Sequence, residues 1–298
     1  MEKAIASPKR TAELLKQYGL NAKKSLGQNF LMDTNILDKM IEAGKIDKST
    51  TVIEIGPGIG ALTEQLLYKA KEVFAFEIDQ RFIPLLETEL GDKGKLKVIN
   101  QDILEVNLKD DLPEQVERLA VVANLPYYIT TPIIMHLLDS GLPVDCFVLM
   151  MQKEVAQRMT AQPHSKAYGS LTIAIDLVCE SEIAFTVPKT VFNPQPRVDS
   201  AVLVLKRRKE LKVPVDSIES FEWIVRQCFT QRRKTLWNNL TQAFGKAEMV
   251  KVALQQALKE AQIPEQSRAE QLSIQEFARL YEAIRSKTDL RPLIKAQD

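Results

Sequence analysis

Metal-binding and disulfide-forming residues are scarce in this sequence, which has three cysteines and two histidines. Cys146, Cys179 and Cys228 lie far apart, without the short paired spacing of a thiolate metal site or the density of a disulfide framework. His136 and His164 stand away from the other candidate functional residues. We therefore expect free buried thiols, no metal site and a cytoplasmic location.

Long apolar runs are also missing. A transmembrane helix needs roughly 20 consecutive apolar residues, and no stretch approaches that length. The N-terminal MEKAIASPKR lacks the apolar centre of a signal peptide. Hydrophobic residues make up 45% of the chain and charged residues 27%, which is ordinary for a globular protein and unlike a disordered one. We expect a globular monomer that does not bind membranes.

The formal net charge of +1 hides an uneven distribution. Residues 1–30 carry six Lys/Arg against two acids, whereas residues 77–119 carry eleven acids against six bases. Residues 223–247 contain basic residues and no acid. A charged run is usually only a solvated face, but two separate basic regions would suit a chain that binds a nucleic acid.

Short β-branched runs alternate with amphipathic helical patterns along the first two thirds of the chain. Strands are expected at residues 51–55, 72–77, 96–101, 119–123 and 146–151, followed by 183–188 and 200–206. The alternation predicts a doubly wound, mostly parallel α/β sheet. Seven strands ending in a hairpin resemble the Rossmann-like fold of a class I methyltransferase more than that of a dinucleotide-binding dehydrogenase.

Helical spacing dominates from Ile218 onward, and Ser273 with Glu276 forms a capping-box pattern. A charged, proline-containing stretch at residues 209–217 separates the two regimes. We therefore predict two domains, residues 1–210 with the sheet and a basic N-terminal arm, and residues 211–298 as a small all-helical domain.

The sharpest local pattern is a strand that runs into the glycine-rich turn Gly56-Pro57-Gly58-Ile59-Gly60. Because these glycines have no side chains, a ligand can lie against the backbone at the end of the strand. The spacing differs from the Gly-x-Gly-x-x-Gly fingerprint, and Pro57 removes an amide that a pyrophosphate could use. A nicotinamide cofactor is therefore a disfavoured alternative.

Acidic residues, Glu77 and Asp102, end the next two strands. Glu77 can accept hydrogen bonds from the ribose hydroxyls of an adenosine-type ligand, and Asp102 can accept one from the adenine amine. A single acid at a strand end is more often a turn or helix cap. Glycines and acids at three consecutive strand ends instead predict a crevice for S-adenosylmethionine.

The fourth strand is followed by Asn124-Leu125-Pro126-Tyr127, a tetrad typical of enzymes that methylate exocyclic amines. An adenine amine is a poor nucleophile because its lone pair is conjugated with the ring. The Asn124 side-chain oxygen and a neighbouring carbonyl could accept its N–H groups and favour a pyramidal nitrogen, while Tyr127 would stack on the base. The alternative is an ordinary Asn-Pro turn with a rim aromatic.

The chain resembles the bacterial small-subunit (16S) ribosomal RNA adenine N6,N6-dimethyltransferase family, the KsgA type, whose relatives include the Erm methyltransferases. The resemblance runs from about Lys23 to near Tyr281. It rests on the two motifs above and on KSLGQNFL at residues 24–31, QKEV at 152–155, FNPQPRVDSAV at 192–202 and QRRKTL at 231–236. Tyr128 differs from the Asn that many members have after the tetrad.

The resemblance implies a site for S-adenosyl-L-methionine and a target adenine. The cofactor would be held by Asn29, Leu31, Gly56, Gly58, Glu77, Asp102 and Asn124. Residues Asn124, Leu125, Pro126 and Tyr127 would place the target amine, and Phe192 would supply a second stacking face. The reaction implied is the transfer of four methyl groups to two adjacent adenosines near the 3′ end of 16S ribosomal RNA.

The same resemblance implies that the RNA is presented by the assembling 30S subunit. The residues expected to contact RNA phosphates are Lys23, Lys24, Arg207, Arg208, Arg232, Arg233 and Lys234. Two other functions stay open: an Erm-like enzyme of the large subunit, which could share every core motif, and an assembly factor that binds the immature subunit and is released by methylation.

Overall fold

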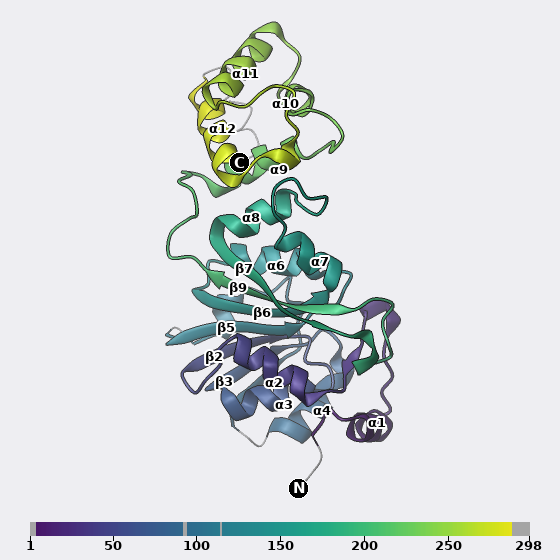
Figure 1. Ribbon diagram of the computed structural model, residues 1–298. Helices are drawn as coiled ribbons and strands as arrows, with labels where there is room; N and C mark the ends of the chain where they lie inside the picture. Colours follow the sequence, from purple (N-terminus) through teal and green to yellow (C-terminus); the bar gives the residue numbers. More distant parts are fainter. Residues whose placement is uncertain (1–3, 92–93, 114, 288–298) are drawn as a thin grey trace. The chain divides into compact units, whose positions relative to one another are not determined.

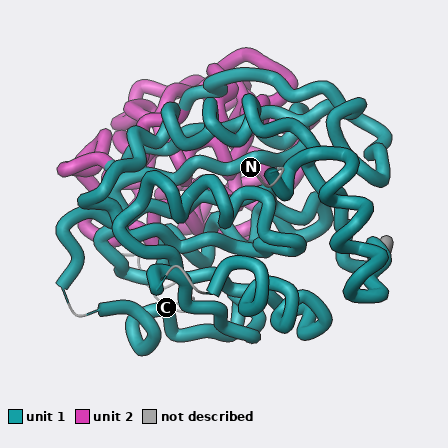
Figure 2. Tube along the Cα trace, turned by 90° about the horizontal axis from the view of Figure 1, so that it is seen from below, with its two compact units in different colours: residues 1–156, 182–207 teal, residues 157–181, 208–298 magenta. Residues whose placement is uncertain are grey.

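A computed structural model describes residues 4–91, 94–113 and 115–287 of the chain. It contains two compact units (Figure 2). The sheet unit comprises residues 1–156 and 182–207, and the helical unit comprises residues 157–181 and 208–298. The helical unit thus includes residues 157–181, which the predicted division at residue 210 had placed with the sheet. Whether two independently folding domains meet at that residue stays a prediction.

A seven-stranded sheet in the order β4-β3-β2-β5-β6-β9-β7 forms the centre of the sheet unit (Figure 1). Its strands are β2 (Thr50–Ile55), β3 (Glu72–Phe76), β4 (Leu96–Ile99), β5 (Arg118–Asn124), β6 (Val144–Gln152), β7 (Cys179–Val187) and β9 (Ser200–Arg207). The β4, β3, β2, β5 and β6 strands pair in parallel, and β9 pairs antiparallel with β6. The predicted Rossmann-like sheet is confirmed.

Helices connect the strands and bury apolar faces against them. They are α2 (Thr34–Ala43), α3 (Ala61–Lys69), α4 (Ile83–Leu90), α5 (Leu108–Asp111), α6 (Thr130–Asp139) and α7 (Lys153–Met159), with the short η2 (Gln80–Phe82) before α4. Met40 of α2, Leu66 of α3 and Leu86 of α4 share one buried cluster with Val52 and Val148 of the sheet. All six residues of β2 are buried, as expected for a central parallel strand.

The chain before β2 lies along the sheet unit. Helix α1 (Pro8–Gln17) begins at an Ser7 cap with proline in its first turn, and Arg10 forms an ion pair with Glu89 of α4. It is followed by η1 (Lys24–Leu26) and by β1 (Phe30–Leu31). After η4 (Lys189–Val191), the two-residue strand β8 (Phe192–Asn193) pairs antiparallel with β1.

The helical unit is built from α8 (Ser170–Val178), α9 (Ile218–Cys228), α10 (Leu236–Phe244), α11 (Glu248–Glu260), η5 (Ala269–Gln271) and α12 (Ile274–Ser286). Its interior includes an edge-to-face pair of Phe221 and Tyr281, with ring centroids 5.7 Å apart. The predicted capping box is confirmed, because Ser273 and Glu276 exchange hydrogen bonds at the start of α12. None of the helices in the described ranges is long and apolar enough to cross a membrane.

Candidate functional site

A pocket lies at the carboxyl ends of the parallel strands in the sheet unit, where open α/β sheets bind their ligands. Together with its mouth it contains about 1080 Å³ of empty space. The structure brings the following predicted site residues to its wall: Asn29, Leu31, Gly56, Gly58, Glu77, Asp102, Asn124, Leu125, Pro126 and Tyr127. These residues are far apart in the sequence. Those that follow β2, β3, β4 and β5 lie close together because these parallel strands are neighbours in the sheet and end at the same edge.

The glycine-rich turn after β2 needs glycine for two different reasons. Gly56 and Gly60 both have a positive φ, of 66° and 83°. A Cβ atom at Gly60 would lie 2.7 Å from Cδ1 of Leu90, so this glycine allows α3 to pack against α4. A Cβ atom at Gly56 would meet no atom within 4 Å, and Gly56 lines the pocket. Gly60 therefore serves packing, whereas Gly56 leaves room for a ligand.

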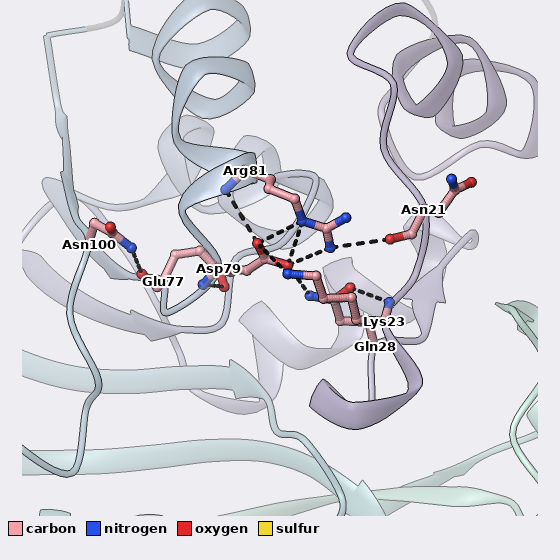
Figure 3. Close-up of polar contacts among 7 residues, drawn as sticks. All are labelled: Asn21, Lys23, Gln28, Glu77, Asp79, Arg81 and Asn100. Atoms are coloured by element: carbon pink, nitrogen blue, oxygen red, sulfur yellow. Dashed lines mark hydrogen bonds and ion pairs between the residues drawn. The ribbon is translucent and has the colours of Figure 1, made fainter.

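Glu77 is a buried carboxylate that the backbone orients at the end of β3. Its Oε2 accepts the N–H of Gly58 at 2.9 Å, and its Oε1 accepts the N–H of Asp79 at 2.8 Å. The side chain of Asn100 donates to the Glu77 carbonyl oxygen at 2.6 Å (Figure 3). Burial raises the pKa of the Glu77 carboxyl. These contacts fix the carboxylate at the pocket wall, next to the glycine-rich turn.

Glu54 is a site residue that the sequence analysis missed. It lies inside β2, is 1% exposed and lines the pocket. Its Oε2 has no hydrogen-bond partner among the described residues. Burial raises the pKa of its carboxyl to about 8. The available signal was an acid in the middle of an otherwise apolar strand, Val52-Ile53-Glu54-Ile55, where a buried carboxyl without a partner is costly.

The Asn-Leu-Pro-Tyr tetrad (residues 124–127) turns sharply after β5. The Asn124 amide nitrogen donates to the Asn29 carbonyl oxygen at 3.4 Å, and the Leu125 N–H donates to the Met150 carbonyl oxygen at 2.9 Å. This use of the amide nitrogen leaves the Asn124 Oδ1 atom as an acceptor. The tetrad thus presents a polar amide at the wall of the pocket, and its role in placing a target amine stays a prediction.

Two tyrosines on this turn differ in their surroundings. The hydroxyl of Tyr127 hydrogen bonds to the Ser200 hydroxyl of β9 at 2.7 Å, and burial raises the pKa of Tyr127. Tyr128 is 58% exposed and also lines the pocket. Its ring lies against Gly27, where an added Cβ would be 3.3 Å from Cδ1 of the ring. Tyr127 is thus anchored, whereas Tyr128 stands at the rim.

Phe192, the predicted second stacking face, is only 3% exposed. Its backbone is tied to the pocket wall, since β8 pairs with β1 and places Phe192 opposite Leu31. Its ring is not part of the wall of the pocket itself. The stacking role of Phe192 stays a prediction, and it requires the ring to turn out of the apolar cluster that now holds it.

The predicted RNA-binding residues fall into two groups. Several already have protein partners. Lys23 pairs with Asp79, Arg207 donates to the Leu138 carbonyl, Arg208 pairs with Asp176 and Glu180, and Arg232 donates to the Tyr168 carbonyl and pairs with Glu270. Arg233 and Lys234 are exposed. The side chain of Lys24 lies outside the described residues. RNA contact by these seven residues stays a prediction.

No group of three or more His, Cys, Asp or Glu side chains within residues 4–91, 94–113 and 115–287 is arranged to hold a metal ion. His136 lies on α6, with its Nε2 buried. The three cysteines are free and buried. The polar groups on the wall of the pocket are carboxylates, amides, backbone groups and two tyrosines.

Comparison with known proteins gives a consistent picture. Residues 19–286 match the model of the family described as ribosomal RNA adenine dimethylase. The ribosomal RNA small subunit methyltransferase A of Latilactobacillus sakei is 55% identical over 283 residues, covering 94% of this chain and 95% of the relative. The protein of the same name from Listeria monocytogenes is 52% identical over 284 residues, covering 94% and 96%.

Two solved structures are similar to this one. A dimethyladenosine transferase from Plasmodium falciparum has a TM-score of 0.70 and 30% identity, covering 84% of this chain and 95% of that one. The 23S rRNA methyltransferase ErmE has a TM-score of 0.65 and 26% identity, covering 85% and 98%.

Proposed function

The chain belongs to the ribosomal RNA adenine dimethylase family, and on this premise we propose that it is an S-adenosylmethionine-dependent enzyme that dimethylates adenine in small-subunit ribosomal RNA. It transfers four methyl groups to the N6 amines of two adjacent adenosines near the 3′ end of 16S RNA. The relatives at 52–55% identity named for the small subunit favour this target over that of the 26% identical ErmE. The family predicted from the sequence motifs is confirmed.

The pocket fits S-adenosylmethionine in charge and shape. The unpartnered Oε2 of Glu54 suits the ammonium of the methionine part, and the open space at Gly56 suits its backbone. Glu77 would accept from the ribose hydroxyls and Asp102 from the adenine amine, while Asn29 and Leu31 line the same pocket. When bound, the cofactor supplies an electrophilic methyl group on a positively charged sulfur.

Asn124 carries the proposal. Its amide nitrogen is used by the Asn29 carbonyl, so its Oδ1 atom can accept one N–H of the target amine. The Leu125 carbonyl, just before Pro126, is the neighbouring acceptor for the second N–H. Two such acceptors favour a pyramidal nitrogen whose lone pair is free to attack. Because the nitrogen becomes strongly acidic as it gains the methyl group, the site needs no strong base.

Tyr127 orients the target base. Its hydroxyl is held by Ser200, so the ring can serve as a fixed stacking surface. Fixing the base in this way would hold the amine ready for attack on the methyl group that the cofactor supplies, and would lower the entropic part of the barrier. The base must leave its own RNA stack to reach this position. The monomethylated amine must fit the same place for the second transfer.

We further propose that the protein acts as a cytoplasmic monomer on RNA within the assembling 30S subunit. The basic residues of the helical unit support contact with RNA, since Arg233 and Lys234 are exposed on a segment without acids. Such side chains bind phosphates and position the RNA without reading its sequence.

The direct test uses labelled S-adenosylmethionine and small subunits that carry unmethylated RNA, with large subunits in parallel. The modified nucleotides are identified by mass spectrometry after nuclease digestion. N6,N6-dimethyladenosine at two neighbouring positions near the 3′ end of 16S RNA is the expected result. Label in large-subunit RNA alone would replace the proposed target with that of an Erm-like enzyme, and no label in either would favour a binding factor.

A further inference from the structure

The segment formed by residues 21–31, here called the N-terminal segment, supplies one wall of the pocket. Leu26 through Leu31 all line it. Regular structure in this segment is limited to the three residues of η1 and the two residues of β1. Such short elements have few backbone hydrogen bonds of their own. The part before β1 therefore depends on side-chain contacts to stay at the pocket.

Those contacts converge on Asp79, whose side chain is 1% exposed (Figure 3). From the N-terminal segment, Gln28 Nε2 donates to Asp79 Oδ2 at 3.0 Å, and Lys23 Nζ lies 3.6 Å from Oδ1. Arg81 donates through Nε to Oδ1 at 2.9 Å and through Nη2 to Oδ2 at 2.6 Å. The same Nη2 also donates to the Asn21 carbonyl oxygen at 3.3 Å.

The segment is braced internally at the same place. The backbone N–H of Lys23 donates to Gln28 Oε1 at 2.8 Å. Gln28 therefore bridges the segment and Asp79 with its two amide atoms. The hydrogen bonds of Arg81 hold the pKa of the Asp79 carboxyl well below its usual range, so Asp79 is ionised at neutral pH.

Asp79 also lies two residues after Glu77 and touches it only through the backbone, by the N–H that donates to Glu77 Oε1. Its side chain and its backbone thus do different things. The backbone orients the carboxylate assigned to the cofactor ribose, and the side chain holds the N-terminal segment. A change confined to the side chain at position 79 can release the segment and leave the donors to Glu77 in place.

We infer that Asp79 is a positioning residue for cofactor binding, which fastens the N-terminal segment over the S-adenosylmethionine pocket. The inference rests on the proposed cofactor site and adds to it. Asp79 does not touch the reacting atoms. Its loss opens one wall of the pocket, so cofactor dissociates faster. The rate of methyl transfer at saturating cofactor is preserved, because bound cofactor holds the segment closed and with it the Asn29 carbonyl that accepts from Asn124, while Tyr127 is held by Ser200 outside the segment.

The test compares Asp79→Asn with the wild-type chain. Asparagine keeps the volume and removes the charge. The Kd of the Asp79→Asn variant for S-adenosylmethionine, measured by calorimetry, is expected to rise about tenfold or more, as for the loss of charge-assisted hydrogen bonds. The kcat on small subunits at saturating cofactor should change less than about twofold, which separates positioning from chemistry. Asp111→Asn is the matched control, because it removes a carboxylate from the Lys97 ion pair elsewhere in the sheet unit.

Limited trypsin digestion reads the segment directly, because Lys23 and Lys24 are cleavage sites within it. We expect cofactor to slow cleavage there in the wild type. Asp79→Asn should be cut there several-fold faster without cofactor, because local opening exposes the backbone, and should need more cofactor for the same protection. Equal Kd and equal cleavage in the variant and the wild type would mean that the Asp79 side chain only caps η2, and would overturn the inference.

Gln28→Glu keeps the test decisive if Asp79→Asn folds poorly. Gln28 is only half-buried, and the change sets a second carboxylate against Asp79, so it should weaken cofactor binding and speed cleavage in the same way. The double variant Gln28→Glu with Asp79→Asn reverses the polarity of this hydrogen bond. It should bind cofactor better than Gln28→Glu alone, and equal or weaker binding would contradict the inference. Wild-type protein that binds cofactor but modifies no ribosomal RNA would refute the proposed target and leave this inference intact.

Discussion

The hydroxyl groups of Tyr127 and Ser200 are joined by a hydrogen bond of 2.7 Å, which links the turn after β5 to the first residue of β9. Tyr127 follows the amide that we assign to the target amine, and Ser200 belongs to a segment more than seventy residues away. The bond fixes the ring that is to stack on the target base. The contribution of this hydrogen bond to the rate of methylation can be measured.

Removal of this bond should slow methylation without affecting cofactor binding. We expect Ser200→Ala to lower kcat/KM for small subunits about tenfold, because a hydrogen bond is worth roughly 1 kcal/mol and small misplacements of a reactant cost rate. Tyr127→Phe should have a similar effect and keep the stacking ring. The double variant should be no worse than either single one, since both remove the same interaction. Fully additive effects would show that the hydroxyls act separately.

Asn124→Ala should abolish most of the methylation and spare most of the cofactor affinity. Loss of a group that stabilises developing charge or geometry at the reacting atoms typically costs about a hundredfold to a thousandfold in rate. Single-turnover methylation of small subunits and calorimetry with S-adenosylmethionine give the two quantities. An Asn124→Ala protein that turns over at the wild-type rate would remove Asn124 from the chemistry.

Much of the sheet could be predicted because its strands are continuous β-branched runs. Strand β2 was expected at residues 51–55 and lies at Thr50–Ile55, and β9 was expected at residues 200–206 and lies at Ser200–Arg207. Strand β7 begins four residues before its predicted start at 183. The prediction missed these residues because Glu180 and Glu182, on the exposed side of the strand, interrupt the apolar pattern. A strand in which charged and apolar residues alternate gives only a weak sequence pattern when part of one of its faces is buried.

Residue type and position alone pointed to the candidate site best at the ends of strands. Glu77, Asp102 and Asn124 stand at such ends, and the structure brings all three to the wall of one pocket, while their roles stay predictions. The pairing of β1 with β8 was not predicted, because each strand has two residues and the partners lie far apart in the chain. Asp79 and Glu54 were missed for a related reason: their importance comes from burial and from partners that only the fold supplies.

The two glycines with different surroundings should respond differently to alanine. Gly60→Ala brings a Cβ within 2.7 Å of Leu90 and 3.0 Å of Leu86, so we expect a loss of about 2–4 kcal/mol in the free energy of unfolding from overpacking and backbone strain. Gly56→Ala has only the backbone strain, roughly 1–2 kcal/mol, and its methyl group points into open space at the pocket.

Urea unfolding and cofactor binding, measured on both variants, separate these effects. Gly56→Ala should lose more cofactor affinity than Gly60→Ala when both variants are compared without urea, at a temperature at which both are folded. The reverse order, with Gly60→Ala the weaker binder and Gly56→Ala the less stable, would contradict the assignment of Gly56 to the ligand and Gly60 to packing.

Glu54 should make the stability of the cofactor-free protein depend on pH. Its pKa is about 8 in the folded protein, raised by burial from an ordinary value of 4.5, so the folded state holds the proton more tightly than the unfolded state. The resulting stabilisation is complete below pH 4.5 and is lost between pH 4.5 and 8, by up to ~1.4 kcal/mol per pH unit. The neutral side chain in Glu54→Gln has no such loss.

The difference in unfolding free energy between Glu54→Gln and the wild type should therefore shift in favour of the variant as pH rises from 5 to 8. Urea titrations at several pH values measure it, and Glu87→Gln, which neutralises an exposed glutamate of α4, is the control. A difference that is constant with pH would show that Glu54 is already ionised in the fold. Glu54→Gln should also weaken cofactor binding, because its amide, unlike the Glu54 carboxyl, cannot give up a proton and pair as an anion with the ammonium.

The predicted RNA-binding residues can be separated by their existing partners. Arg233 and Lys234 are exposed on the acid-free segment, so Arg233→Gln and Lys234→Gln should weaken binding to small subunits and reduce the salt slope by about one for each lost phosphate contact. Arg208 lies between Asp176 and Glu180, so Arg208→Gln should instead lower the stability of the helical unit. Binding at a series of salt concentrations, with urea unfolding of each variant, gives both quantities. A salt slope reduced by about one in Arg208→Gln, with unchanged stability, would mean that its carboxylate partners release it to the RNA.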